Sequence, residues 1–359
     1  MPAFLILITG IMFSNLSFAN PLLGLPPLSF PQDNQQTEEK IKLGRLLFND
    51  VRFSSNGSIS CASCHLKDKA FTDGLKVPKG VYGLTGTRNA PTVINAAFYT
   101  ELFLDGRAES LESQALGPFV NLVEHGLTDY KKIIDVIRSD TEYPLVFKQV
   151  FGVAVNKVTI DHVVKAIASF ERTLIAGNSR FDQYYFGRDH SRLSESEARG
   201  LRLFRRKGNC ANCHEISFDN ALFMDNRYYN IGVGFQRLES KLGDIVSLVK
   251  AGKKVEHMGL TADQYSELGR FNVTNKITDI GKFKTPSLRN IGLTAPYMHN
   301  GSIETLEEVI DYYDKGGQHN QYIDAAMFPL HFTRQEKIDL LEFLKSLNSP
   351  LLQSRYPEP

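Results

Sequence analysis

Two short stretches, Cys61-Ala-Ser-Cys64-His65 and Cys210-Ala-Asn-Cys213-His214, contain all four cysteines of this 359-residue chain. The pattern C-x-x-C-H is typical of haem c attachment, in which two thiols form thioethers to the porphyrin and the histidine that follows binds the iron. The sequence therefore predicts two covalent haem c groups. Cys61, Cys64, Cys210 and Cys213 are the predicted attachment points, and His65 and His214 are the predicted proximal iron ligands.

Two other uses of the cysteines fit the pattern less well. A single zinc site with four thiolates would have to join pairs that lie far apart in the sequence, and it would leave both histidines without a role. A thioredoxin-like redox pair would occur once and without the repeated histidine.

The charge balance argues against one broad class of partner. Lysine and arginine together number 41, aspartate and glutamate 40, and the formal net charge is +1. Such a chain has no overall positive field that would attract nucleic acid or an anionic membrane, so no nucleic-acid partner is predicted.

The N-terminus resembles an export signal. Residues 3–13 are apolar but too few to span a bilayer, and Ser17-Phe18-Ala19 fits a small-residue cleavage site. We therefore predict a signal peptide over residues 1–19, a periplasmic location and no membrane span. No Lys or Arg precedes the apolar run, and the alternative is a buried N-terminal helix.

An internal repeat suggests two domains of one kind. Leu43-Gly44-Arg45-Leu46-Leu47-Phe48 precedes the first haem motif, and Arg199-Gly200-Leu201-Arg202-Leu203-Phe204 precedes the second. We expect a mainly α fold of two tandem cytochrome c-like domains, each with one covalent haem c. Their predicted bounds are residues 20–177 and 178–359, with a hinge over 177–192.

Helical signals dominate elsewhere, and no run of alternating strands is convincing. Apolar periodicity predicts helices over 129–137, after Thr128, and over 161–176, stopped by Gly177. Capping boxes at Ser194-x-x-Glu197 and Thr333-x-x-Glu336 predict two further helix starts. The packing positions expected in the last helix are Ile338, Leu341, Phe343, Leu344 and Leu347. The polar segment 236–267 is interpreted as a solvated surface insertion, with a docking site as the alternative.

Several linked segments make the chain resemble the bacterial di-haem cytochrome c peroxidase family, which includes MauG-type enzymes, over nearly its whole mature length. The segments are Gly86-Thr-Arg88-Asn89-Ala-Pro91-Thr, Leu104-Asp105-Gly106-Arg107, Leu111-Glu-Ser-Gln114-Ala-Leu-Gly117-Pro118, Val123-Glu124, Phe283-Lys-Thr-Pro286-Ser-Leu-Arg289-Asn290 and Ala295-Pro296-Tyr-Met-His299-Asn-Gly301.

The resemblance implies two cytochrome c domains with a calcium ion between them. It implies that the N-terminal haem meets hydrogen peroxide and that the C-terminal haem stores or relays an electron. Asn89 and the carbonyls of Thr294 and Pro296 would hold the calcium, whose preference for oxygen ligands they satisfy. Glu124 matches the catalytic glutamate, which would move a proton during O–O cleavage, and Gln114 would order the distal water.

The first departure from the family pattern concerns the N-terminal haem. Many family members block it with a second histidine, which would fall near Val81. Residues 71–87 contain neither His nor Met, so the first haem is expected to be open in its ferric state. Tyr82 or a lysine is the alternative sixth ligand.

The second departure concerns the C-terminal haem, where Tyr313 stands in place of the family's methionine. Thr305 caps a predicted helix that puts Tyr313 on the face of Val309 and Ile310. A phenolate stabilises ferric and higher iron states, whereas methionine raises the reduction potential. This is the MauG-type arrangement. The alternative is that Tyr313 is a packed core aromatic and that Met298 or Met258 binds the iron.

The third departure lies between the haems, where the family commonly has a tryptophan. Here the position is Leu104, and the chain has no Trp. Charge would have to pass directly between porphyrin edges, through water, or through Phe103 or Tyr99.

These features predict a hydrogen-peroxide-dependent oxidoreductase. Its electrons would come from a small periplasmic redox protein or, as in MauG, from oxidisable side chains of a partner protein. A non-enzymatic di-haem electron carrier is the alternative from another class. A homodimer is expected from the family alone.

Overall fold

The computed structural model describes residues 22–349, so the predicted signal peptide lies outside the described part of the chain. Within that part, no helix is both long and apolar enough to cross a membrane. The fold is mainly α, as expected.

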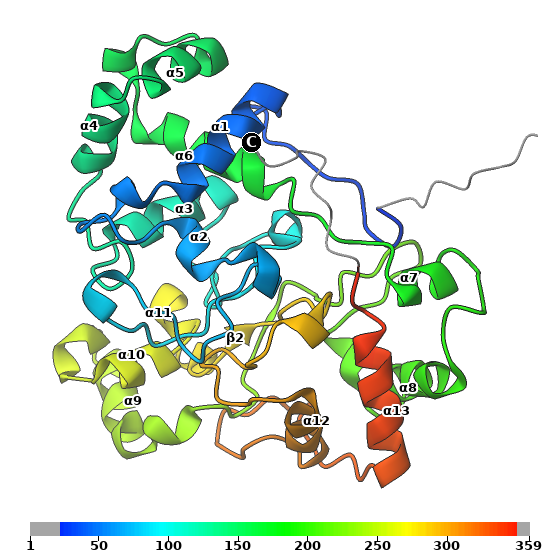
Figure 1. The fold of residues 1–359 in the computed structure, drawn as a ribbon. Helices are drawn as coiled ribbons and strands as arrows, with labels where there is room; N and C mark the ends of the chain where they lie inside the picture. Colours follow the sequence, from blue (N-terminus) through cyan, green and yellow to red (C-terminus); the bar gives the residue numbers. More distant parts are fainter. Residues whose placement is uncertain (1–21, 350–359) are drawn as a thin grey trace, which may run out of the picture.

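Thirteen α-helices make up the described fold (Figure 1). They are α1 (Glu38–Asn49), α2 (Cys61–Cys64), α3 (Leu111–Val120), α4 (Lys131–Ser139), α5 (Tyr143–Phe151), α6 (Ile160–Glu171), α7 (Arg180–Tyr185), α8 (Glu195–Arg205), α9 (Leu242–Lys250), α10 (Ala262–Glu267), α11 (Phe271–Thr274), α12 (Leu306–Asp314) and α13 (Arg334–Lys345).

Short 3-10 helices lie in the connections, at Val51–Phe53, Lys67–Lys69, Val81–Gly83, Ala96–Phe98, Val155–Lys157, Cys210–Asn212, Phe235–Arg237, Glu239–Lys241, Val255–Met258, Ile277–Asp279 and Ile291–Leu293. The strands β1 (Tyr228–Tyr229) and β2 (Phe283–Lys284) form one antiparallel pair, with Tyr228 opposite Lys284.

Two helix crossings organise the two halves of the fold. In the first half α1 packs on α6, and in the second α8 packs on α13. Both crossings run through the glycine of the repeated hexapeptide. A Cβ on Gly44 would lie 1.9 Å from the carbonyl oxygen of Ala166, and a Cβ on Gly200 would lie 2.0 Å from that of Asp339. The sequence repeat thus marks the same close helix contact twice.

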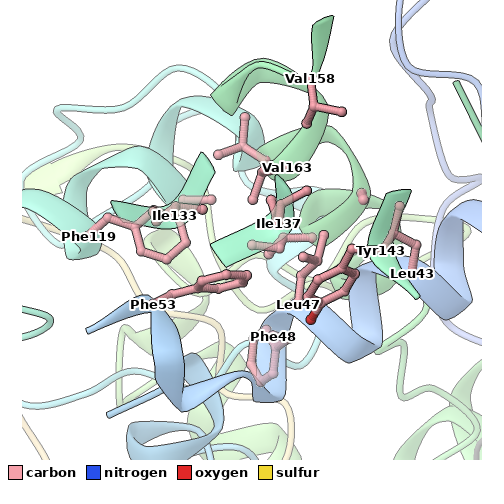
Figure 2. Close-up of a cluster of buried hydrophobic side chains, with 14 of the residues drawn as sticks. Leu43, Leu47, Phe48, Phe53, Phe119, Ile133, Ile137, Tyr143, Val158 and Val163 are labelled. Atoms are coloured by element: carbon pink, nitrogen blue, oxygen red, sulfur yellow. The ribbon is translucent and has the colours of Figure 1, made fainter. Parts of the chain in front are cut away.

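Each half has its own aromatic-rich core. The first core, drawn in Figure 2, gathers Phe48, Phe53, Phe119 and Phe147 from α1, α3, α5 and the loop after α1. The second core gathers Phe181, Phe204, Phe223 and Phe343, whose rings meet mostly edge to face. The boundary at 177/178 stays a prediction.

The segment predicted as a hinge is not a free linker. Phe181 is fully buried in the second core, and the buried carboxylate of Asp182 pairs with the Arg289 guanidinium at 2.9 Å. The same guanidinium donates to the carbonyl of Gly24, so the start of the described chain lies against the second half.

The segment 236–267, predicted as a solvated surface insertion, is exposed along much of its length but also has a buried side. Leu238, Leu242 and Ile245 are buried with Phe235 and Phe271 in a third apolar cluster. Most of its lysines and glutamates are exposed, whereas Glu267 is buried and pairs with Arg237 and His299, so composition alone concealed the amphipathic pattern.

Helix ends were predicted less well than helix starts. The capping boxes at Ser194 and Thr333 are confirmed. The helix predicted over 161–176 ends at Glu171, because the Asn95 side chain binds both the N–H and the carbonyl of Ala176 at 2.9 Å. The helix predicted over 129–137 runs two residues later as α4. In α13, Ile338 is 42% exposed and is not a packing position.

The close crossing of α1 and α6 predicts that adding a methyl group to the glycine at the crossing lowers the free energy of unfolding, whereas adding one to an uncrowded glycine does not. Gly44→Ala should lower the free energy of unfolding of the first half by about 1–3 kcal/mol, because the added Cβ overlaps backbone. Gly243→Ala is the matched control, since nothing lies within 4 Å of its Cβ position in α9. It should be neutral or stabilising by up to about 1 kcal/mol. Denaturant unfolding followed by far-UV circular dichroism measures both, and an unchanged midpoint in Gly44→Ala would contradict the packing.

Candidate haem sites and the interface between them

The first haem motif forms the short helix α2 and the histidine that follows it. Ser60 and Ser63 cap α2 reciprocally. The Nδ1–H of His65 donates to the carbonyl of Phe71 at 3.1 Å, which fixes the ring and leaves Nε2 for the iron. Burial lowers the pKa of His65, so the imidazole is neutral, as iron ligation requires.

The second motif repeats this arrangement. The Nδ1–H of His214 donates to the carbonyl of Phe223 at 2.9 Å, and burial lowers the pKa of His214. No disulfide joins any of the four cysteines, and burial raises the pKa of Cys64 and of Cys210 to about 12. Two unpaired thiols beside one oriented imidazole, found twice, fit haem c.

The carbonyl that orients each histidine is held by a strained backbone that the sequence did not reveal. Phe71 and Phe223 both have positive φ, 58° and 53°, which is uncommon for a bulky residue. The preceding carbonyls, of Ala70 and Leu222, accept hydrogen bonds from Thr92 and Ser287 at 2.6 and 2.7 Å. The only signal of this feature in the sequence is the hydroxyl residue after a proline, Thr92 after Pro91 and Ser287 after Pro286.

A second repeated unit leads into the helix that faces each haem motif. Single bridges join Leu102 to Ala108 and Tyr297 to Ile303. Inside them Phe103 and Met298 have positive φ, and Ser110 and Thr305 then cap α3 and α12.

This alignment makes the eighth residues of the two helices equivalent. They are Pro118 in α3 and Tyr313 in α12. A proline side chain cannot bind iron, whereas a tyrosine can. The structural repeat therefore pairs the predicted sixth ligand of the second haem with a residue that cannot bind iron in the first half.

The surroundings of Tyr313 match a side chain that faces the second haem. Its ring packs against the second core, and its hydroxyl makes no hydrogen bond to any described residue. The neighbouring Tyr312 hydroxyl instead donates to the carbonyl of Ile231 at 2.8 Å. Burial, with smaller contributions from Cys210 and Cys213, raises the pKa of Tyr313. The alternative ligand Met258 packs against the third apolar cluster, and Met298 takes the place of Phe103 in the repeat.

Glu124 lies close enough to the first haem motif for its charge to act on the Cys61 and Cys64 thiols. Burial raises the pKa of Glu124, against the opposing effects of Arg107 and of Asn121. Asn121 Nδ2 donates to the Glu124 carboxylate at 2.6 Å. Burial raises the pKa of the Cys61 and Cys64 thiols, and the Glu124 charge adds a smaller effect on each. Gln114, in α3, is half-buried, and its side chain makes no hydrogen bond to a described residue.

The segment around Val81, where the resemblance would place a blocking histidine, packs directly against Glu124. The Val81 N–H donates to the Glu124 carbonyl at 3.0 Å, and the Val81 side chain is 1% exposed. Tyr82 is 73% exposed, so its side chain points to solvent and not into the pocket. His125 donates to the carbonyl of Phe53 at 3.0 Å and is buried, which is a structural role.

The loop that carries Leu104 is held by residues of the second half. The Lys284 N–H donates to the Leu104 carbonyl at 2.8 Å, and Lys284 Nζ donates to the Glu101 carbonyl at 2.5 Å. The Lys284 ammonium lies 3.7 Å from the Tyr99 ring centroid, as the Arg107 guanidinium lies 3.4 Å from that of Phe103. Burial lowers the pKa of Lys284 to about 7. Both aromatics proposed for charge transfer thus have a basic group on one face.

Comparison with known proteins places these features in a family. Residues 38–190 match the family model for di-haem cytochrome c peroxidase. The cytochrome-c peroxidase IdrP1 of Pseudomonas sp. (strain SCT) is 38% identical over 92% of this chain and 87% of its own. The chain belongs to the di-haem cytochrome c peroxidase family. It is therefore an enzyme of an oxidoreductase family, and the interpretation as a simple electron carrier is not supported.

Two further relatives fall on the MauG side of this family. The methylamine utilization protein MauG of Methylorubrum extorquens is 33% identical over 89% of this chain and 81% of its own. The crystal structure of a MauG-like protein associated with microbial copper homeostasis is 33% identical, covers 91% of this chain and 94% of its own, and superposes with a TM-score of 0.75.

The calcium ligands expected from the family are only partly brought together by the described contacts. The Asn89 N–H donates to the carbonyl of His299, three residues after Pro296, at 2.9 Å. Asn89 Nδ2 donates to the Leu75 carbonyl at 2.8 Å, which leaves its Oδ1 free for a cation. The Thr294 hydroxyl turns back to Ile291, so only the Thr294 carbonyl is available. An amide oxygen and carbonyls are the donor types that calcium accepts.

Proposed function

We propose that this chain is a periplasmic peroxidase that reduces hydrogen peroxide at the haem carried by Cys61, Cys64 and His65. That haem would be held by Cys61, Cys64 and His65, and when bound it would supply the iron that reacts with peroxide and stores oxidising equivalents. The observation that carries the proposal is the structural repeat, which puts Pro118 where the second half has Tyr313. The position predicted for a blocking ligand is occupied by Val81, whose buried side chain cannot bind iron. This also supports an open first haem.

Glu124 is the proposed acid and base. Cleavage of the O–O bond needs a proton to leave the oxygen nearer the iron and to reach the oxygen that departs as water. A carboxylate within hydrogen-bond reach of both can accept the first proton and donate it to the second. Burial raises the pKa of Glu124, which favours this exchange of a proton, and the hydrogen bond from Asn121 holds the orientation of the carboxylate. Gln114 is proposed to order the water beside it.

Tyr313 is the proposed sixth ligand of the second haem. A phenolate is a hard anionic ligand that stabilises oxidised iron. The second haem is therefore suited to share oxidising equivalents with the first, and poorly suited to accept an electron from a conventional donor. Overall, hydrogen peroxide takes two electrons and two protons and yields two water molecules.

The source of the two electrons has two candidates. The peroxidase relatives favour a small periplasmic redox protein. Tyr313 favours the second candidate, oxidation of side chains on a partner protein as in MauG. We also propose a single calcium ion at Asn89, Thr294 and Pro296, and a domain boundary near 177/178.

Replacing Glu124 tests its assigned role. Glu124→Gln should slow the reaction of the di-ferric protein with peroxide by about a hundredfold or more. The wild-type rate should rise with pH through an apparent pKa above the ordinary value of 4.5 for glutamate, because burial raises it, and this limb should vanish in the variant. Stopped-flow spectroscopy measures both. Glu109→Gln, an exposed glutamate on a nearby loop, should leave the rate unchanged, and equal rates in all three proteins would rule out the assignment.

Tyr313 and Tyr312 offer a matched pair of variants. Tyr313→Phe should convert the second ferric haem from low spin to high spin, because phenylalanine cannot bind iron. Tyr312→Phe should leave the spin state unchanged, because its hydroxyl bonds to Ile231. The visible spectrum of the ferric protein distinguishes the two. If the second haem stays low spin in Tyr313→Phe, another residue is its sixth ligand. Loss of the low-spin signal in Met298→Leu would then identify that residue as Met298.

A further inference from the structure

Each haem motif is followed by a loop with an aspartate at the same structural place. Asp73 lies two residues after Phe71, and Asp225 lies two residues after Phe223. One oxygen of each carboxylate accepts the backbone N–H two residues further on, at 2.9 Å in both cases. The carbonyls of Phe71 and Phe223 accept the Nδ1–H groups of His65 and His214. Each aspartate therefore lies two residues along the chain from the group that orients its proximal histidine.

The second oxygens of the two carboxylates differ. Asp225 Oδ2 accepts a hydrogen bond from the Tyr229 hydroxyl at 2.6 Å. Asp73 is 4% exposed, and its Oδ2 is buried without a hydrogen-bond partner among the described residues. The Lys69 ammonium nearby donates to the Asp73 backbone carbonyl at 2.8 Å and not to its carboxylate. Tyr229 lies four residues after Asp225, and the residue four after Asp73 is Val77, which has no donor.

We infer that Asp73 is a positioning residue that lowers the reduction potential of the first haem, and that Tyr229 prevents Asp225 from doing the same to the second. An ionised carboxylate whose second oxygen has no donor is screened less than one that accepts from a phenol, and in a medium of low dielectric constant its attraction for the more positive, oxidised iron is strong. A phenol that donates to the carboxylate spreads and screens that charge. The two proximal aspartates thus differ in two respects: Asp73 is buried and its Oδ2 lacks a donor, whereas Asp225 is half-buried and accepts from Tyr229.

The inequality suits a peroxide-reactive haem. That haem must hold oxidising equivalents, and an uncompensated anion on its proximal side stabilises iron in the oxidised state. The inference rests on the proposed assignment of His65 to the peroxide-reactive haem and of His214 to its partner. The inference gives a structural cause for a difference between the reduction potentials of the two haems.

The test is the reduction potential of each haem, measured by spectroelectrochemistry on the intact di-haem protein. Asp73→Asn keeps the shape of the side chain and removes the charge. It should raise the potential of the first haem by the equivalent of at least a tenfold change in the ferric-to-ferrous equilibrium, about 59 mV for one electron, and leave the second within a twofold change. Asp73→Glu should restore a value near the wild type. Asp225→Asn should shift the second haem by less than Asp73→Asn shifts the first.

A variant in the other half tests the same inference in the opposite direction. Tyr229→Phe leaves Asp225 without its phenol donor, so the potential of the second haem should fall. If Asp73→Asn fails to take up its first haem, this variant decides the question alone. An unchanged or raised second potential in Tyr229→Phe, or an Asp73→Asn that moves both haems equally, would overturn the inference. A wild-type protein that does not react with peroxide, although the potentials of the variants shift as expected, would instead count against the proposed function, so the two failures are distinguishable.

Discussion

The hydrogen bond from each haem-motif histidine to a backbone carbonyl is the constraint on which the rest of the structure depends. His65 and His214 can present Nε2 to iron only while Nδ1 is bound, and the acceptors are the carbonyls of Phe71 and Phe223. Holding those carbonyls in place requires a left-handed residue and a Thr or Ser that secures the carbonyl before it. The loops that provide these contacts also carry Asp73 and Asp225. Orientation of the histidine and the charge beside it are therefore consequences of the same local structure.

The two halves share one arrangement of helices and loops, and they differ at a few positions that would determine their chemistry. Both halves have a glycine at the close helix crossing, a capped helix (α3 or α12) and a loop whose left-handed phenylalanine presents the carbonyl to the histidine. At the eighth residue of the helix, the first half has a proline and the second has a tyrosine. Beside the aspartate, the first half lacks a donor and the second has Tyr229. Between the halves, Lys284 and Arg270 bind the loop that carries Leu104, the position at which the resemblance predicts a tryptophan.

What the sequence could predict follows from how local each signal is. The capping boxes are set within five residues and are confirmed. The attachment cysteines and the histidines after them are equally local signals, and their roles stay predictions. The ends of helices were less predictable, because a distant side chain, Asn95, terminates the helix that periodicity extended to 176. The positive φ of Phe71 and Phe223 gave no signal, since strain in a bulky residue is imposed by tertiary contacts. The core beneath segment 236–267 was missed because composition averages over both faces of its helices. The roles of Glu124, Gln114 and Tyr313, and the calcium ligands, stay predictions that the geometry supports.

The central claim is that an open first haem and a tyrosinate-bound second haem act together on peroxide. The most direct measurement is electron paramagnetic resonance of the di-ferric protein, before and after one equivalent of hydrogen peroxide, with no reductant present. The account predicts one high-spin and one low-spin ferric signal at the start and the loss of both after peroxide. Signals that stay unchanged until the protein has first been reduced would contradict it, because they would mean that the first haem is blocked in its resting state.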